Sequence, residues 1–138
     1  MTAWKPQVLN IIPYNETSSN RVQDERGIRL SQVSFDEFKK LDMRIGRVVQ
    51  AERVPRTARL YKIIVDLGEL GRRQTVSSLV GFYTPEELVG KRIVFLVNLQ
   101  PTKFGGELSE GMLLAAEKGD KLALLTTERE IENGANVT

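Results

Sequence analysis

Apolar and polar residues alternate along several short stretches of this sequence, and a period of two residues is typical of a half-buried β-strand. The clearest case is residues 60–69, with the sequence LYKIIVDLGE. One face of this stretch carries Tyr61, Ile63, Val65 and Leu67, and the other carries Lys62, Ile64 and Asp66. We therefore predict a strand with one face in the core and the other at least half exposed to water.

Five further stretches rich in β-branched and apolar residues predict strands at 43–54, 72–80, 91–99, 111–116 and 121–126. Gly46 lies inside the first of them, which predicts a bend or a bulge there. The residues GELG at 68–71 have a length and composition that predict a hairpin between the second and third strands.

Two short helices are predicted from capping signals. Ser34 and Glu37 have the spacing of a capping box, and Thr84 and Glu87 repeat it. In the second helix Pro85 takes the first helical position, and Gly90 is suited to a left-handed stop. Neither helix is long enough to form the framework.

Five or six curved strands with a short helix between the third and fourth predict an all-β fold, a five-stranded barrel of the OB kind. A two-sheet β-sandwich is the alternative. We expect residues 33–138 to form this domain. Residues 1–32 show no sustained period and are interpreted as an extension that is partly disordered or that docks on a partner. Its larger apolar residues are expected to pack on the domain or on a neighbouring subunit: Trp4, Ile11, Ile12 and Tyr14.

Composition limits the kinds of catalytic and metal site that the chain can form, because its 138 residues include no cysteine and no histidine. Disulfides, thiolate nucleophiles, imidazole bases and the usual zinc sites are thereby excluded. The acidic neighbours Asp36, Glu37, Glu86 and Glu87 fall in the first turns of the predicted helices, where the helix dipole explains them. We therefore predict a protein that is not an enzyme and has no cofactor or metal site.

Neither a membrane-spanning run of roughly 20 apolar residues nor a secretory signal is found. We therefore expect a cytoplasmic protein without a membrane partner. The formal net charge is only +2, so the placement of cations says more than their sum.

The run from Asn98 to Ala116, NLQPTKFGGELSEGMLLAA, interrupts the β pattern with small and polar residues. A barrel that binds RNA needs cations for phosphates, polar atoms for ribose or base edges, and apolar surface for stacking. Lys103 is the candidate cation. The polar and apolar candidates are Asn98, Ser109, Glu110, Phe104 and Met112. The ordinary alternative is that the polar side chains satisfy loop backbone and that the methionine fills the core.

Two pairs of arginines are expected near the rim of an OB binding face. Arg56 and Arg59 lie between the first two strands, and Arg72 and Arg73 begin the third. Solvated surface charge is the alternative for each pair.

The motifs in 35–54, 60–68, 72–80, 85–101 and 109–116 together resemble the tRNA-binding domain found free-standing in bacteria and archaea and appended to methionyl-tRNA synthetases. The similarity covers roughly residues 34–138. Two departures stand out. The family's His-Pro-x-Ala-Asp-Lys-Leu-Tyr is VPRTARLY here, which keeps a cation at Arg59, and its Lys-Met-Arg-Gly is KFGG, which loses a basic residue at Gly105.

The resemblance implies an OB-fold that holds tRNA by its shape, acting as a homodimer or beside a methionyl-tRNA synthetase or another synthetase. It assigns Ser109 and Met112 to the tRNA face and identifies residues 124–138 as a segment for pairing of two copies. An export-related, peptide-binding chaperone branch shares the scaffold and remains the alternative. The predicted nucleic-acid site comprises Arg59, Arg73, Asn98, Lys103, Ser109, Glu110 and Met112.

Overall fold

The computed structural model describes residues 21–23 and 29–138, and the chain divides into two compact units, Met1–Leu41 with Thr138 and Asp42–Val137. Most of the predicted extension 1–32 therefore lies outside the described residues. So do Trp4, Ile11, Ile12 and Tyr14, whose expected packing concerns that part of the chain.

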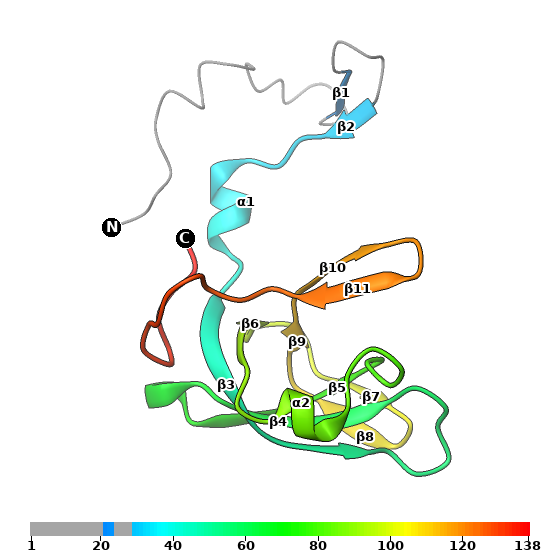
Figure 1. Cartoon of the computed structure of the whole chain (residues 1–138). Coiled ribbons are helices and arrows are strands. Elements are labelled where there is room, and N and C mark those ends of the chain that lie inside the picture. Colours follow the sequence, from blue (N-terminus) through cyan, green and yellow to red (C-terminus); the bar gives the residue numbers. More distant parts are fainter. Residues whose placement is uncertain (1–20, 24–28) are drawn as a thin grey trace. The chain divides into compact units, whose positions relative to one another are not determined.

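The described part of the first unit holds one small hairpin and one short helix (Figure 1). Strand β1, Arg21–Gln23, pairs antiparallel with β2, Arg29–Ser31. Helix α1, Phe35–Lys39, begins at the predicted capping box, because the Ser34 side chain accepts from the Glu37 backbone N–H and the Glu37 carboxylate accepts from the Ser34 N–H. The hydrogen bond from the Ser34 backbone N–H is the main cause of the lowered pKa of Glu37, and the Ser34 side chain adds to it.

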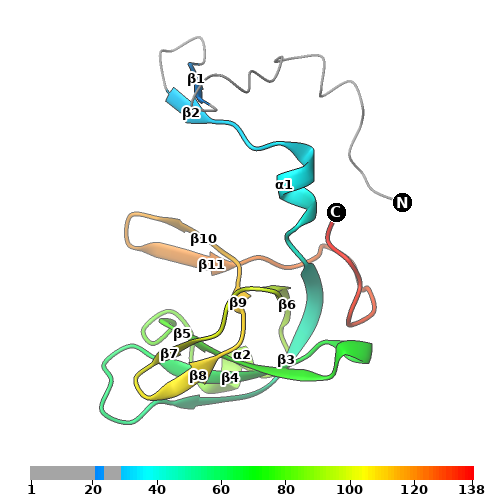
Figure 2. The same ribbon diagram turned by 180° about the vertical axis from the view of Figure 1, so that it is seen from behind.

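The second unit is built on one antiparallel sheet with strand order β5-β4-β3-β6-β9 (Figures 1 and 2). Its strands are β3 Met43–Arg53, β4 Tyr61–Asp66, β5 Arg72–Ser77, β6 Arg92–Leu96 and β9 Met112–Leu113. A 3-10 turn at Gly68–Leu70 joins β4 to β5, and helix α2, Pro85–Leu88, lies between β5 and β6. The long strand β3 pairs with β6 through its first half and with β4 through its second, so it bends across the sheet.

The two outer strands of this sheet approach each other and nearly close it into a barrel. Residues 108–111, around the start of β9, lie along β5: the Glu110 N–H donates to the Gln74 carbonyl at 2.8 Å, and the Gln74 Nε2 donates to the Leu108 carbonyl at 2.8 Å. The predicted all-β fold with short helices is confirmed as a five-stranded, OB-like barrel. One continuous sheet excludes the two-sheet sandwich.

Two hairpins extend this framework. Strand β7, Thr102–Phe104, pairs with β8, Glu107–Ser109, and β10, Ala115–Lys118, pairs with β11, Lys121–Leu124. The single strand predicted at 111–116 is therefore two strands, because β9 pairs with β6 in the barrel whereas β10 pairs only with β11. Figures 1 and 2 both show the β10–β11 hairpin projecting away from the barrel strands.

The C-terminal residues return to the barrel along the edge of β3 that β4 leaves uncovered. Ile45 N–H donates to Ala135 at 2.9 Å, Gly134 N–H donates back to Ile45 at 2.7 Å, and Val137 N–H donates to Met43 at 2.9 Å. This segment therefore completes the hydrogen bonding of the first half of β3.

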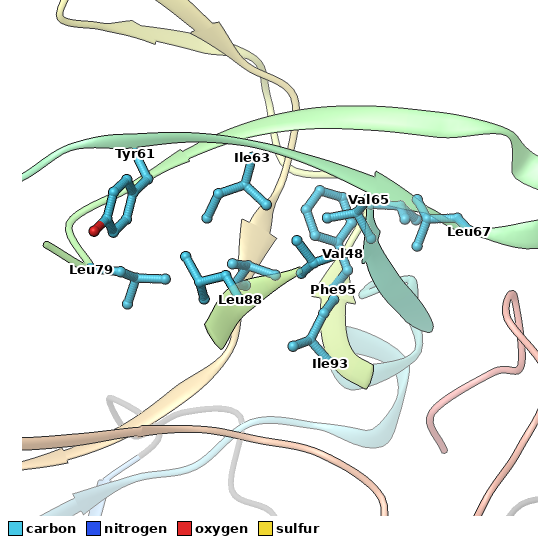
Figure 3. Packing of buried hydrophobic residues seen from close by; sticks show 11 residues of the cluster. Val48, Tyr61, Ile63, Val65, Leu67, Leu79, Leu88, Ile93 and Phe95 are labelled. Atoms are coloured by element: carbon cyan, nitrogen blue, oxygen red, sulfur yellow. The ribbon is translucent and has the colours of Figure 1, made fainter. Parts of the chain in front are cut away.

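The core is a cluster of apolar side chains from the barrel strands, which Leu88 of α2 joins (Figure 3). Phe95, Ile63, Ile93 and Leu88 are fully buried, and they come from three different elements. The predicted inner face of β4 is confirmed, since Tyr61, Ile63, Val65 and Leu67 are all at most 4% exposed.

Most local signals in the sequence are confirmed, with one correction. The Thr84–Glu87 capping box forms, and Gly90 has a φ of 93° just after α2. The bulge in β3, however, falls between Val48 and Gln50 rather than at Gly46. Gly46 is needed instead for close packing, because a Cβ there would lie 2.6 Å from Val65 Cγ1 and 2.8 Å from Leu67 Cδ2.

Candidate nucleic-acid interface

The run that interrupts the β pattern is a tight hairpin. β7 and β8 are joined by Gly105 and Gly106 alone, with φ angles of 59° and 83°. Two consecutive positive φ angles are the requirement of a type I′ turn, the connection that best matches the twist of paired strands. The glycine pair therefore exists to turn the chain sharply at this point.

The tip of this hairpin rests on the loop between β3 and β4. A Cβ at Gly105 would lie 2.9 Å from Thr57 Cγ2, 3.2 Å from Val54 Cγ1 and 3.3 Å from Leu60 Cδ1. Only glycine lets the backbone come this close. The contact joins two segments that are about 45 residues apart in the sequence. We call residues 54–60, residues 102–108 and Met112 together the candidate RNA face.

A charged side chain ties the base of the hairpin to the barrel. Lys62 Nζ lies 3.0 Å from Glu52 Oε1 on β3 and 3.7 Å from Glu107 Oε1 on β8. The hydrogen bond to Glu52 is the main cause of the raised pKa of Lys62, and Glu107 adds to it. The amine thus stays charged and links three strands beside the candidate RNA face.

The candidate RNA face exposes both cations and apolar surface. Lys103, Arg56 and Arg59 are exposed. So are three large apolar side chains, Phe104 at 48%, Leu108 at 40% and Met112 at 42%. Leu108 is an addition to the sequence-based site. Its signal is the two-glycine turn, which fixes the register Lys103↔Leu108 and so places Lys103 and Leu108 on one face of the hairpin, with Phe104 and Glu107 on the other.

Arg56 has a further peculiarity, a φ of 65°, which is uncommon for a residue other than glycine. It lies in the turn closed by the Thr57 N–H and Thr57 hydroxyl, both of which donate to the Val54 carbonyl. The loop is thereby held in one shape with its arginines outward.

Ser109 does not lie where the prediction placed it. It is only 6% exposed, and its hydroxyl accepts from the Val76 N–H at 3.1 Å and donates to the Gly111 carbonyl at 3.1 Å. The fully buried Thr75 hydroxyl lies 3.2 Å away and also reaches the Gly111 carbonyl. Ser109 therefore replaces a missing backbone hydrogen bond where the barrel closes, and this burial leaves it no surface for RNA.

The other polar candidates are braced against the backbone. Glu110 Oε1 accepts from the Gln74 N–H at 3.2 Å, Asn98 Oδ1 accepts from the Asp42 N–H at 2.9 Å, and Arg73 donates to the Val97 carbonyl at 3.2 Å. Arg72, at the start of β5, is exposed. Arg59 and Lys103 thus lie on the loop and the hairpin that meet at Gly105, and Met112 is exposed on β9. Asn98, Glu110 and Arg73 instead bond to backbone groups distant in the sequence.

Within the described ranges, no cluster of three or more His, Cys, Asp or Glu side chains is arranged to hold a metal ion. No helix of the described residues is long and apolar enough to cross a membrane.

Residues 43–136 match the family model described as "Putative tRNA binding domain". A methionine-tRNA ligase of Archaeoglobus fulgidus is 49% identical over 117 residues, which cover 85% of this chain but 18% of the ligase. The chain thus spans less than a fifth of the length of the curated relatives it matches.

Two solved structures are similar across the barrel. A MetRS-related protein from Pyrococcus horikoshii is 42% identical with a TM-score of 0.74, covering 79% of this chain and 100% of that one. The chaperone CsaA of Bacillus anthracis is 33% identical with a TM-score of 0.71, covering 78% of this chain and 99% of that one. The family match spans the whole barrel, from β3 to the C-terminal strand pairing, and the chain therefore belongs to the tRNA-binding domain family.

Proposed function

We propose that the chain binds tRNA by its shape, without catalysing a reaction, and assists a methionyl-type synthetase in the cytoplasm, either as part of it or as a separate partner. The observation that carries this proposal is the packing of the β7–β8 hairpin tip against the loop 54–60. That contact brings the hairpin that carries Lys103, Phe104 and Leu108 against the loop that carries Arg59, on a barrel of the tRNA-binding family.

The chemistry of this surface suits a folded RNA. Arginine and lysine neutralise phosphates, and apolar or aromatic side chains support bases that leave the helical stack. Phe104 offers an exposed ring for stacking and Met112 an exposed, deformable contact. Few base-edge groups are exposed here, so discrimination among tRNA sequences is expected to be weak.

Asn98, Glu110 and Arg73 act in this proposal by holding the loops in place. Each uses one of its polar atoms in a hydrogen bond to the backbone of a segment distant in sequence. Ser109 contributes through barrel closure alone.

The test is a gel-shift titration of bulk tRNA, with duplex DNA of matched length as control. The full chain is expected to bind tRNA more tightly than the DNA. Phe104→Ala is expected to weaken binding by about 1–3 kcal/mol if one base stacks on the ring. Equal affinity for both nucleic acids, or no binding of either, would contradict the proposal.

A second function is supported by the similarity to CsaA, a chaperone. The exposed side chains of Phe104, Leu108 and Met112 could hold an extended peptide, with exposed strand edges adding backbone hydrogen bonds. An unfolded apolar peptide, added to the same titration, separates the two. RNA binding is expected to fall steeply with salt, whereas capture of an apolar peptide is not.

We further propose that two copies pair as a homodimer, which would offer a longer surface to tRNA than one barrel. Light scattering of the full chain tests this, and a monomer at micromolar concentration would refute it. Gentle co-purification tests the association with a synthetase, which is refuted if none is retained.

A further inference from the structure

A second cluster of cations lies on elements that do not contribute to the candidate RNA face. It lines a pocket of about 290 Å³ formed by β3, the start of β6 and the residues that follow β11. Its cations are Arg47, Lys91 and Arg92, and Tyr83 and Thr126 complete the polar lining.

The strand register places two of these cations side by side. Arg47 on β3 and Arg92 on β6 are direct partners, so their side chains leave the same face of the sheet. Lys91 precedes Arg92. Like charges directly opposite each other destabilise a sheet, so this arrangement needs compensation by negative charge.

The polar contacts within the pocket hold the cations without neutralising most of them. Arg47 donates to the Gly90 carbonyl at 2.7 Å, and Lys91 Nζ lies 5.4 Å from the centre of the Tyr83 ring. Among the described residues, neither cation has a carboxylate within ion-pair distance.

Arg92 is partly buried, with a side chain 16% exposed. It donates to the Thr127 hydroxyl at 3.4 Å and pairs with Glu130 at 3.4 Å, and Glu130 is itself 85% exposed. The Arg92 Nε–H is buried and has no hydrogen-bond partner among the described residues. A buried donor without a partner costs free energy, so the guanidinium is incompletely satisfied by the protein alone.

The charges do not balance. Three cations and the Glu130 carboxylate leave an excess of two positive charges around the pocket. Asp66, the partner of Arg47 on β4, accepts from the Gly68 N–H at 2.9 Å and lines a different pocket.

We propose that this pocket binds a phosphate group, with Arg47, Lys91 and Arg92 as its ligands and the Glu130 carboxylate as the group it displaces. Paired guanidinium groups suit the oxygens of phosphate, and lysine adds a point charge. The phosphate belongs either to an RNA backbone outside the candidate RNA face or to a free phosphate compound. Both present the same oxygens to the pocket.

The experiment is a titration of the isotope-labelled full chain with inorganic phosphate at constant ionic strength, followed by the amide NMR signals of Gly90–Arg92 and Leu124–Thr126. Saturable shifts are expected at these amides. Lys91→Gln is expected to weaken binding by about tenfold or more, as for loss of a charge-assisted hydrogen bond. Glu130→Gln is expected to strengthen it by about two- to fivefold, because it removes the competing carboxylate.

Lys118→Gln, an exposed lysine on β10, is the matched control and is expected to change nothing at these amides. Addition of tRNA then separates the two sources. Displacement of the phosphate signals by tRNA assigns the pocket to RNA backbone, whereas retained phosphate assigns it to a free phosphate compound. The proposal is overturned if these amides show no saturable shift, or if Lys91→Gln and Lys118→Gln have equal effects.

The result is separable from the proposed function. The effect of Lys103→Ala on tRNA binding tests the candidate RNA face alone. The phosphate titration tests the pocket, and its result does not depend on that variant.

Discussion

At the residue scale, Ser109 is the side chain whose observed position differs most from its predicted role. Its hydroxyl takes the place of a backbone group between β8 and β5, and the buried Thr75 hydroxyl joins it at the Gly111 carbonyl. A serine in a motif associated with RNA thus serves barrel closure. Its effect on binding is expected to pass through the fold.

Ser109→Ala is therefore expected to lower the free energy of unfolding by about 1–3 kcal/mol, because the buried Val76 N–H loses its acceptor. Chemical denaturation measures this, with the exposed Ser78→Ala as the matched control. Unchanged stability together with lost tRNA affinity would show that the hydroxyl touches RNA after all.

Gly111 has almost no room for a side chain. A Cβ there would lie 2.5 Å from the Leu96 carbonyl oxygen and 2.5 Å from the Phe95 ring, and Phe95 is fully buried. Overpacking of this kind costs typically about 1–3 kcal/mol and occasionally more, so Gly111→Ala is expected to lower the thermal midpoint clearly. Met112→Ala, at the exposed neighbouring position, is expected to leave it nearly unchanged. Equal midpoints for both variants would refute the close packing.

At the scale of elements, the hairpin β7–β8 depends on Lys62, which joins it to β3 and β4. The pKa of Lys62 is raised above its ordinary value of 10.5 by Glu52 first and Glu107 second. The stabilisation from its charge is therefore present in full below pH 10.5 while the carboxylates are ionised. It is lost as the pH rises through the raised pKa.

Lys62→Met is expected to destabilise the chain near pH 8, and the difference from the natural chain is expected to vanish in strongly alkaline solution. Thermal unfolding across a pH series measures both. A stability difference that stays constant above pH 10.5 would contradict the assignment to charge, since only packing would then be involved.

Much of this architecture could be predicted from the sequence, because it rests on local patterns. The alternation along β4 gives its buried face, and the two capping boxes give the starts of α1 and α2. Contacts between distant segments could not be predicted in the same way. Ser109 meets Val76 across 33 residues, and Gly46 is required by side chains on β4 and just beyond it.

The same distinction between local patterns and distant contacts applies to the candidate site. Exposed cations in the segments between the barrel strands, such as Arg59 and Lys103, could be predicted from the sequence, because such connecting segments of a small barrel lie at its surface. The roles of Asn98, Glu110 and Arg73 were not, since each depends on a hydrogen bond to a distant backbone group. Polar residue type alone does not reveal whether a side chain serves the ligand or the loop.

At the scale of the whole molecule, a chain with a net charge of only +2 must rely on the local grouping of its cations to attract RNA. The candidate RNA face groups Arg59 and Lys103 by folding one hairpin onto one loop. We therefore expect few contacts with phosphates, and a tRNA affinity that falls as the salt concentration rises.

The most direct measurement of this central claim is the dependence of tRNA affinity on salt concentration for the natural chain and for the double variant Arg59→Ala/Lys103→Ala. Each lost phosphate contact is expected to reduce the slope of log affinity against log salt by about 0.7 to 0.9. The control variant Lys118→Ala/Lys121→Ala, on the β10–β11 hairpin, is expected to keep the natural slope. A double variant with the natural slope and affinity would contradict the claim that tRNA binds on the face made by the hairpin and the loop.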